Sequence, residues 1–235
     1  MYLATHMVRS MKLKEGDTVL DLGCGKGTTS VFLARHFGVK VVALDLWTSA
    51  TFLNTKFTRL GYRDRIIPLN LDVTRRLPFA EGYFDAVFCM NSFSFYGGNM
   101  DFLQHLLKHL RTGGQLCIGS EVLTDEFTEE QLKNTPPVYA FKLPAPNENV
   151  DVFEDDFNKQ HTPRWWQELF EKSGLLEVEF CRELEDATVL YEEMVRDNYI
   201  HNKDSFDLEI CLEQLEWERI NRPRKSLFVI TSHKK

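Results

Sequence analysis

The sequence predicts an α/β fold, a doubly wound sheet of seven mostly parallel strands with helices on both faces and an antiparallel last strand. Two observations predict it. Short apolar runs bounded by turn residues alternate with amphipathic stretches of about ten residues over positions 18–120. A glycine-rich segment, DLGCGKG, directly follows the first long apolar run and precedes a helical stretch. Strands buried on both faces by crossover helices read as continuous apolar runs, as these do.

Each element can be assigned from its apolar run and from the residues that end it. Glycine or proline follows most helical stretches, which indicates where each one stops. The helical stretch at 5–11 stops before Gly16, and the turn Gly113-Gly114 precedes the fifth strand. We expect strands at 18–22, 40–46, 66–71, 83–90, 115–119, 176–180 and 226–231. We expect helices at 5–11, 28–36, 49–60, 100–110, 163–172, 187–199 and 204–219.

The whole chain, 1–235, reads as a single domain with two insertions. Residues 18–120 form the core, which carries the first five strands. An acidic insertion at 121–160 interrupts the strand and helix alternation and contains four prolines. We expect it to form a lid at the edge of the sheet. A helical insertion at 185–222 precedes the last strand.

Charge is distributed unevenly along the 235 residues. The formal net charge is −7, and segment 121–160 alone carries ten acidic residues against three lysines. The segment also contains phenylalanine and tyrosine, so it is not a simple solvated tail. An acidic chain is a poor match for a phosphate backbone, which disfavours sequence-independent nucleic-acid binding. The 43% hydrophobic content excludes a mainly disordered protein.

The cysteines and the start of the chain bear on compartment. The five cysteines are scattered, with no CxxC pair and no zinc-ligand spacing, which suits a reducing cytoplasm. We find no signal peptide and no apolar run of about 18 residues, so we expect a cytoplasmic protein without membrane insertion. His105 and His109 lie one helical turn apart, but their helix should face away from the ligand edge. We therefore predict no metal site.

The glycine-rich segment is the most informative feature of the sequence. Its glycines, Gly23, Gly25 and Gly27, let the backbone turn sharply and approach a ligand closely. The spacing is GxGxG, because Thr28 stands where the dinucleotide fingerprint has its third glycine. Asp21 precedes the loop, and a carboxylate there suits a cationic ammonium better than a pyrophosphate. The alternative is a tight strand-to-helix turn without a ligand.

A second carboxylate, Asp45, ends the second predicted strand. In doubly wound sheets an acid at this place accepts hydrogen bonds from ribose hydroxyls, at the edge where ligands bind. An apolar strand that ends in a carboxylate is not explained by packing alone. Asp45 therefore favours a nucleoside-containing ligand.

Four segments in order resemble the class I S-adenosylmethionine-dependent methyltransferases, which have a Rossmann-like fold. The segments are VLDLGCGKGTTSVFLA, VVALDL, LNLDVTRRLPFAEGYFDAVFCMNSF and LRTGGQLCIGS. The resemblance is nearest to the small-molecule, type 11-like group and covers residues 18–120 clearly. It implies in-line transfer of a methyl group from S-adenosylmethionine to an oxygen, nitrogen or carbon nucleophile of a small molecule. The NPP[FY] tetrapeptide of amino-directed nucleic-acid methylation is absent.

The resemblance implies which residues hold the methionyl end of the cofactor. Asp21, Gly23, Cys24 and Gly25 would line the methionine moiety. Asn91, which ends the fourth strand, would contact the same end through its backbone. Asn91 could instead be no more than a strand-terminating residue.

The resemblance also implies which residues hold the adenosine. Asp45 would bind both ribose hydroxyls, with Leu46 beside the adenine. Asp72 would accept from the adenine amino group, and Val73 would pack on the ring. Asp72 could instead be a turn-forming residue.

The catalytic residues are not fixed by the sequence. Tyr96, Glu121 and His161 are the candidates, because each lies at or near the predicted substrate edge. Tyr96 belongs to an aromatic run that could instead pack under the following helix, and Glu121 could be an exposed acid. A general base is needed only if the acceptor must lose a proton. The acidic segment and the aromatic run suggest an amine-bearing or aromatic acceptor.

Two other functions remain open from the residues. One is a non-catalytic protein that binds S-adenosylmethionine. The other is a nicotinamide-dependent oxidoreductase, which the GxGxG spacing disfavours.

Overall fold

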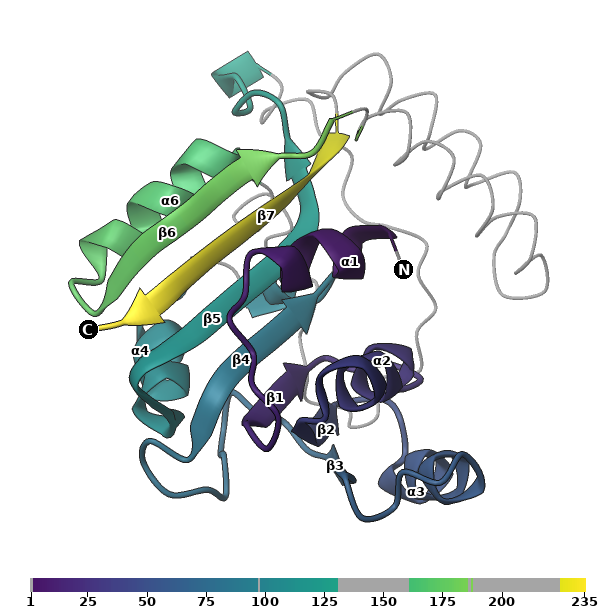
Figure 1. The fold of residues 1–235 in the computed structure, drawn as a ribbon. Coiled ribbons are helices and arrows are strands. Elements are labelled where there is room, and N and C mark those ends of the chain that lie inside the picture. The colour runs from purple at the N-terminus through teal and green to yellow at the C-terminus, as the bar shows by residue number, and fades with distance from the viewer. Residues whose placement is uncertain (1, 97, 131–160, 186, 188–224) are drawn as a thin grey trace, which may run out of the picture.

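The computed structural model describes residues 2–96, 98–130, 161–185, 187 and 225–235 (Figure 1). Its centre is a seven-stranded sheet of order β3-β2-β1-β4-β5-β7-β6. The strands are β1 (Thr18–Leu22), β2 (Lys40–Asp45), β3 (Ile66–Asn70), β4 (Phe84–Met90), β5 (Leu110–Leu123), β6 (Leu176–Glu183) and β7 (Lys225–Lys234). The helices are α1 (Tyr2–Arg9), α2 (Thr28–Phe37), α3 (Ala50–Arg59), the 3-10 helix η1 (Phe93–Tyr96), α4 (Met100–His109) and α6 (Pro163–Lys172).

Strand directions confirm the predicted fold class. β1 pairs in parallel with β2 and β4, β2 with β3, and β4 with β5. The last strand, β7, runs antiparallel to both of its neighbours, β5 and β6. It therefore lies inside the sheet, while β3 and β6 form the edges. None of the described helices has the length and apolar composition that crossing a bilayer requires.

Helices cover both faces of the sheet, as predicted. One buried cluster joins α1, α2 and α3 to alternate strand residues such as Val19, Val41 and Phe88. The other joins η1, α4 and α6 to the residues between them, such as Leu20 and Leu44. Figure 1 shows α1 lying across β5 and β7, which are also its main contacts. The two cores explain why the strands are apolar throughout rather than alternating.

Several element boundaries differ from the expectation: α1 begins at Tyr2 and ends at Arg9, β7 extends over Lys225–Lys234, and β5 and β6 are longer than predicted. The predicted turn at Gly113-Gly114 lies within β5, which starts at Leu110. The ladder pairs Phe84 with Leu110 and then Ala86 with Gln115, so residues 111–114 form a bulge in the strand. β6 extends past its predicted end because it pairs with β7 as far as Glu183. The predicted helix 204–219, the predicted helix 187–199 beyond its first residue, and most of both insertions lie outside the described residues.

The topology fixes where a ligand can bind. All five parallel strands, β1 to β5, end at the same edge of the sheet. The chain order reverses between β1 and β4, because β2 and β3 lie on one side of β1 and β4 and β5 on the other. Doubly wound sheets bind ligands in the crevice outside the strand ends at such a switch point. The loops after β1, β2 and β4 meet there.

The last glycine of the loop after β1 fixes α2 against α3. Gly27 precedes α2 in the left-handed conformation, with φ of 74°. A Cβ placed on it would lie 2.6 Å from the ring of Phe57 and 3.1 Å from Leu53, both on α3. Glycine is therefore needed at this position for two reasons, the backbone conformation and the close approach of α3.

Replacing Gly27 with alanine should lower the free energy of unfolding by about 2–4 kcal/mol. About 1 kcal/mol comes from the left-handed backbone and the rest from overpacking against Phe57. Gly61 is the matched control, since its φ is 79° but no atom lies within 4 Å of its added Cβ. Gly61→Ala should lose only about 1 kcal/mol. Urea denaturation measures both, and equal losses would contradict the packing argument.

Candidate functional site

The loop after β1 is fixed between the ends of β2 and β4. The backbone N–H groups of Gly23 and Cys24 both donate to the carbonyl of Leu44 in β2, at 2.8 and 3.0 Å. On the other side the Ser92 hydroxyl, after β4, donates to the carbonyl of Leu22 at 2.8 Å. A Cβ on Gly23 would lie 2.2 Å from the Ser92 Oγ, so only glycine fits there. The loop has one position relative to both neighbours.

Asp45 at the end of β2 organises the backbone around it. Its Oδ2 accepts from the N–H of Gly25 at 2.9 Å. Its Oδ1 accepts from the N–H groups of Trp47 and Thr48 at 2.9 and 2.7 Å. A carboxylate has about four acceptor positions, so these three bonds leave about one for a ligand hydroxyl. The Asn70 side chain donates to the carbonyls of Asp45 and Leu46, which fixes the start of the following loop.

Asp21 is a buried carboxylate, with 1% of its surface exposed. Its Oδ2 accepts from the hydroxyls of Thr29 and Ser30 on α2, at 2.7 and 2.6 Å. Both of these hydrogen bonds fall on the same oxygen. Burial raises the pKa of Asp21 from 3.8 to about 6, and the two hydroxyls and the nearby Asp45 modify that shift. A cation beside this group would gain a strong electrostatic partner and restore its ionised form.

Gly25 provides the open part of the loop. Its φ is 52°, and no atom lies within 4 Å of the Cβ that another residue would carry. The space beside its backbone fits a close-lying ligand. Cys24, next to it, is buried, and its thiol lies 3.7 Å from the Gly25 carbonyl. Burial raises the pKa of Cys24 well above its ordinary value, so the thiol stays protonated.

Asp72 and Val73 follow β3, and the side chains of both make contacts within the protein. The Asp72 Oδ1 accepts from the Thr74 N–H and hydroxyl, at 3.0 and 2.6 Å. Its Oδ2 pairs with Arg75 at 3.1 Å. The turn-forming alternative therefore describes the Asp72 side chain in this structure. Val73 is 2% exposed and packs in the core below.

Asn91 has an unusual backbone conformation after β4. Its φ of 54° makes it the one non-glycine residue with a positive φ in the described ranges. Asparagine tolerates this conformation better than most residues, although it still costs energy. The N–H of Asn91 donates to Gly119 in β5 at 2.8 Å, which fixes the turn at the strand end. Such strain commonly occurs at ligand sites.

Tyr96 combines a packed ring with a hydroxyl near the acids of the site. Its ring stacks on Phe102 of α4 at 4.2 Å, as the packing alternative predicts. Burial raises the pKa of Tyr96 well above its ordinary value, and the charges of Cys89, Asp45 and Asp72 raise it further. The hydroxyl is therefore neutral near pH 7 and can donate a hydrogen bond, but it is a poor base.

The two other catalytic candidates lie near the end of β5. Glu121 pairs with Lys225 of the neighbouring strand β7 at 3.3 Å. His161 follows the acidic insertion, and its carbonyl accepts from the N–H of Leu123 at 3.1 Å. The structure thus brings His161 to the carboxyl end of β5, although it is 38 residues away in sequence from Leu123.

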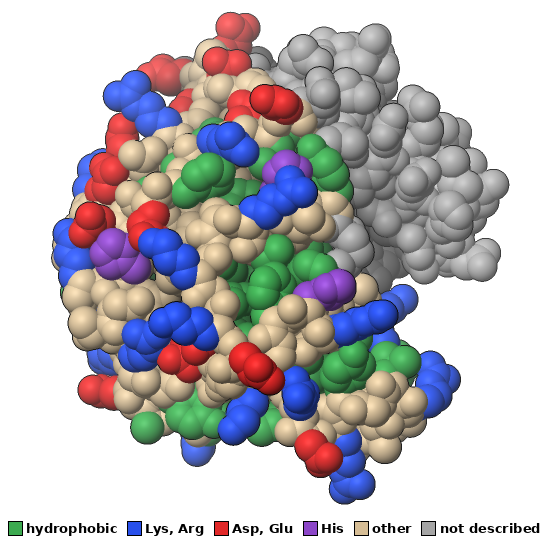
Figure 2. Space-filling view, viewed as in Figure 1, with side chains coloured by type: hydrophobic (Ala, Val, Ile, Leu, Met, Phe, Trp, Pro, Cys, Tyr) green, Lys and Arg blue, Asp and Glu red, His purple; other side chains and the backbone are tan. Residues whose placement is uncertain are grey.

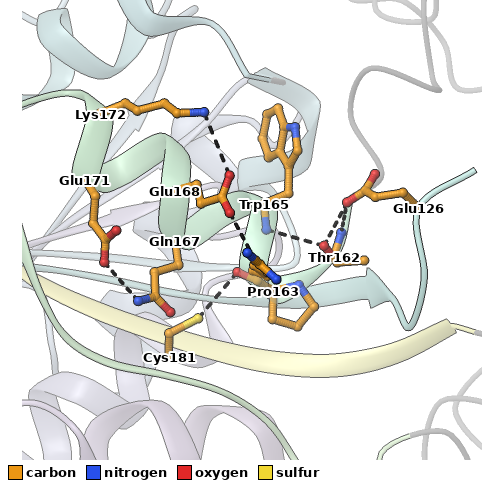
Figure 3. A network of polar contacts seen from close by, with 10 residues as sticks. Glu126, Thr162, Pro163, Trp165, Gln167, Glu168, Glu171, Lys172 and Cys181 are labelled. Carbon is orange, nitrogen blue, oxygen red and sulfur yellow. Dashed lines mark hydrogen bonds and ion pairs between the residues drawn. The ribbon is translucent and has the colours of Figure 1, made fainter.

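Glu126 orients His161. The His161 Nδ1 lies 2.9 Å from the Glu126 Oε2. The Glu126 Oε1 accepts from the Thr162 N–H and hydroxyl (Figure 3). Burial alone would raise the pKa of Glu126, but the hydrogen bonds from Thr162 and His161 outweigh it and lower the pKa. Glu126 is thus an ionised acceptor, so Nδ1 of His161 carries a proton and donates.

The His161 ring also stacks on Trp165 of α6, with centroids 3.6 Å apart. Thr162 caps α6 by accepting from the N–H of Trp165 (Figure 3). Trp165 in turn closes on Gly98 after η1, where an added Cβ would lie 2.5 Å from the indole. The ring of His161 is therefore linked through one side chain to the loop after β4.

Acidic side chains gather where the described part of the insertion leaves β5. Asp125, Glu126, Glu129 and Glu130 are all exposed, and residues 121–130 contain no lysine or arginine. Figure 2 shows acidic groups at this end of the molecule.

Within the described ranges, no three His, Cys, Asp or Glu residues converge as a metal site would require.

Sequence reasoning missed several residues that hold the site together. Thr29 and Ser30 could have been found, because hydroxyls that open a helix after a glycine loop lie near the preceding strand. Ser92, Trp47 and Glu126 carry no such signal. Their roles come from contacts between segments that are distant in the sequence.

Comparisons with known proteins identify the core. Residues 19–114 match the family model described as a methyltransferase domain. The sarcosine/dimethylglycine N-methyltransferase of Halorhodospira halochloris is 25% identical over 181 residues, 72% of this chain and 65% of that protein. The erythromycin 3''-O-methyltransferase of Saccharopolyspora erythraea is 30% identical over 52% of this chain and 40% of its own length. This chain thus spans less than two thirds of either relative.

Solved structures share the architecture. A putative sarcosine dimethylglycine methyltransferase from Galdieria sulphuraria matches 99% of this chain and 83% of its own, with a TM-score of 0.72 and 17% identity. Geranyl diphosphate C-methyltransferase from Streptomyces coelicolor A3(2), solved with S-adenosyl-L-homocysteine, matches 100% of this chain and 79% of its own, with a TM-score of 0.70 and 17% identity. Residues 19–114 are thus similar to methyltransferase domains, and the seven-stranded sheet has the architecture of solved S-adenosylmethionine-dependent methyltransferases.

Proposed function

We propose that this protein transfers a methyl group from S-adenosylmethionine to a small molecule. One observation carries the proposal. A buried carboxylate, Asp21, lies behind a glycine loop whose open position, Gly25, admits a close ligand. Bound S-adenosylmethionine would supply a methyl group already activated on a sulfonium. The residues present fit this cofactor, which has a cationic ammonium for Asp21 and a ribose hydroxyl for the remaining acceptor position of Asp45.

The proposed cofactor residues occupy one continuous edge. Asp21, Gly23, Cys24 and Gly25 would hold the methionyl end, with the strained backbone of Asn91 opposite them. Asp45 and Leu46 would hold the ribose and flank the adenine. Asp72 and Val73 would complete the adenine end, where the Asp72 carboxylate already accepts from Thr74 and Arg75. If Asp72 contacts the adenine, one of its carboxylate oxygens must therefore accept from the adenine as well as from Thr74 or Arg75.

An amine-bearing acceptor fits the charge at the end of β5. Exposed acids with no lysine or arginine among residues 121–130 favour the approach of a cation. The names of two matched proteins, from H. halochloris and G. sulphuraria, specify secondary or tertiary amines as their acceptors. The same acids disfavour an anionic acceptor. An ammonium acceptor must lose a proton before its nitrogen can act as a nucleophile.

His161 is the best placed of the three candidates to take that proton. Tyr96 holds its proton too tightly, and Glu121 is paired with Lys225. In His161 the Nδ1–H donates to Glu126, so Nε2 of the neutral ring is the basic atom. Glu126 also stabilises the imidazolium that forms. We assign His161 as the general base and Glu126 as the residue that positions it.

The Asp21 assignment predicts how pH controls cofactor binding. The Kd for S-adenosylhomocysteine, measured by calorimetry, should fall up to about tenfold between pH 5 and 7 as Asp21 ionises, and level off above about pH 7. Asp21→Asn should bind more weakly with little pH dependence. No binding by the wild type at any pH would overturn the proposed function, and tighter binding to a nicotinamide cofactor would favour an oxidoreductase.

The same residue predicts a stability difference that needs no ligand. Because its folded pKa is about 6 and its ordinary value 3.8, the folded state holds the Asp21 proton more tightly than the unfolded state. Stability from this group is therefore greatest at low pH and is lost as pH rises through 4–6. Relative to Asp21→Asn, the free energy of unfolding of the wild type should fall by about 3 kcal/mol across that pH range. If the unfolding free energies of the wild type and Asp21→Asn changed in the same way from pH 4 to pH 6, the raised pKa of Asp21 would be contradicted.

The assignment of the base predicts a split between turnover and binding. With an amine that gives turnover, dimethylglycine being the first to test, His161→Gln should lower kcat at least about 10²-fold. Glu126→Gln keeps an acceptor for Thr162 and should lower kcat less, about tenfold. Both should leave the Kd for S-adenosylhomocysteine within about twofold of wild type. Glu129→Gln, an exposed acid of the same segment, is the control, and equal losses in all three variants would refute the assignment.

A further inference from the structure

Two aromatic side chains meet across the switch point of the sheet. Trp47 belongs to the loop after β2 and Phe95 to η1 after β4, and their ring centroids lie 5.8 Å apart in an edge-to-face arrangement. Because β1 lies between β2 and β4, the two rings join loops from either side of the strand that carries the glycine loop. Neither residue was singled out by the sequence for a role in cofactor binding.

The ring pair lies on the outer side of the crevice. Trp47 and Phe95 are 37% and 41% exposed, among the most exposed large apolar side chains of the described residues. By contrast, Asp45 is buried and Ser92 partly buried where they tie the same loops together at the strand ends. The hydrogen bonds of Asp45 and Ser92 therefore lie on the inner side of the crevice outside the strand ends, and the contact between Trp47 and Phe95 lies on its outer side. A ligand in that crevice would lie between them.

We propose that Trp47 and Phe95 form an aromatic clasp that closes over the bound cofactor and slows its release. The clasp rests on the proposed function, because it assumes that the cofactor occupies this crevice. Each ring exposes apolar surface that a ligand or the partner ring can cover. Tyr96, next to Phe95, is held by stacking on Phe102, so η1 presents Phe95 from a fixed support. The backbone of Trp47 is fixed by the hydrogen bond that its main-chain N–H donates to the Asp45 Oδ1.

The clasp gives a reason for the exposure of two aromatic side chains, Trp47 and Phe95, that contact each other. Single exposed aromatic side chains are common, as Phe52 shows, but Trp47 and Phe95 touch each other from separate loops and so form a joint apolar surface. An edge-to-face pair contributes about 0.5–1.5 kcal/mol, enough to slow release severalfold yet weak enough to open in each cycle.

A double-mutant cycle in the full chain tests the clasp. Trp47→Ala and Phe95→Ala should each raise the dissociation rate of S-adenosylhomocysteine about fivefold, measured by surface plasmon resonance. The double variant should add less than about twofold to the larger single effect, because either change alone opens the clasp. Phe95→Tyr keeps the ring and should stay within about twofold of wild type. Phe52→Ala, a phenylalanine that is 53% exposed on the neighbouring α3, is the matched control.

The outcomes separate the clasp from the proposed function. Single variants that bind with wild-type rates, or effects that multiply in the double variant, overturn the clasp alone. A wild type that does not bind S-adenosylhomocysteine overturns the proposed function and the clasp together. A melting temperature that stays near wild type in all variants, together with faster dissociation, supports the clasp over a merely structural role.

Discussion

The backbone that follows β1 is held by hydrogen bonds from both neighbouring strands. The Leu44 carbonyl accepts two N–H groups of the loop from the β2 side, and Ser92 reaches the end of β1 from the β4 side. Asp45 adds a bond to the open position, Gly25. Because β2, β1 and β4 end at one edge, the loop cannot shift without breaking contacts with both. A cofactor that binds here meets a surface already arranged, which lowers the entropy lost on binding.

That arrangement confines a carboxylate where water cannot reach it. Burying Asp21 is unfavourable, and the hydroxyls of Thr29 and Ser30 offset only part of the cost, since the pKa of Asp21 stays raised at about 6. Strain of this kind is retained where function requires it. A cationic group beside Asp21 would relieve the cost, so we propose that the burial of Asp21, which destabilises the free protein, also selects the ligand. Asn91, strained at the end of β4, belongs to the same part of the site.

The sequence was informative wherever local rules decide the structure. Helix α6 runs from Pro163 to Lys172 as predicted, because a proline suits the first turn and Thr162 caps it. The bulge in β5 and the extra length of β6 were not predictable, since pairing with β4 and β7 sets them. Within the site, Asp21 was found from its place just before the glycine loop, and Asp45 from its place at the end of a strand. Glu126 was not, because it meets His161 across 35 residues of sequence.

The central claim is that Asp21 recognises the cationic end of the cofactor. The most direct test is to follow the carboxyl carbon of Asp21 by NMR, in protein labelled with ¹³C-aspartate and assigned with Asp21→Asn, as pH is varied. We predict a pKa of about 6 in the free protein, falling by at least about one unit when S-adenosylhomocysteine is added. An Asp21 pKa that the ligand leaves unchanged, while binding is observed, would contradict the account.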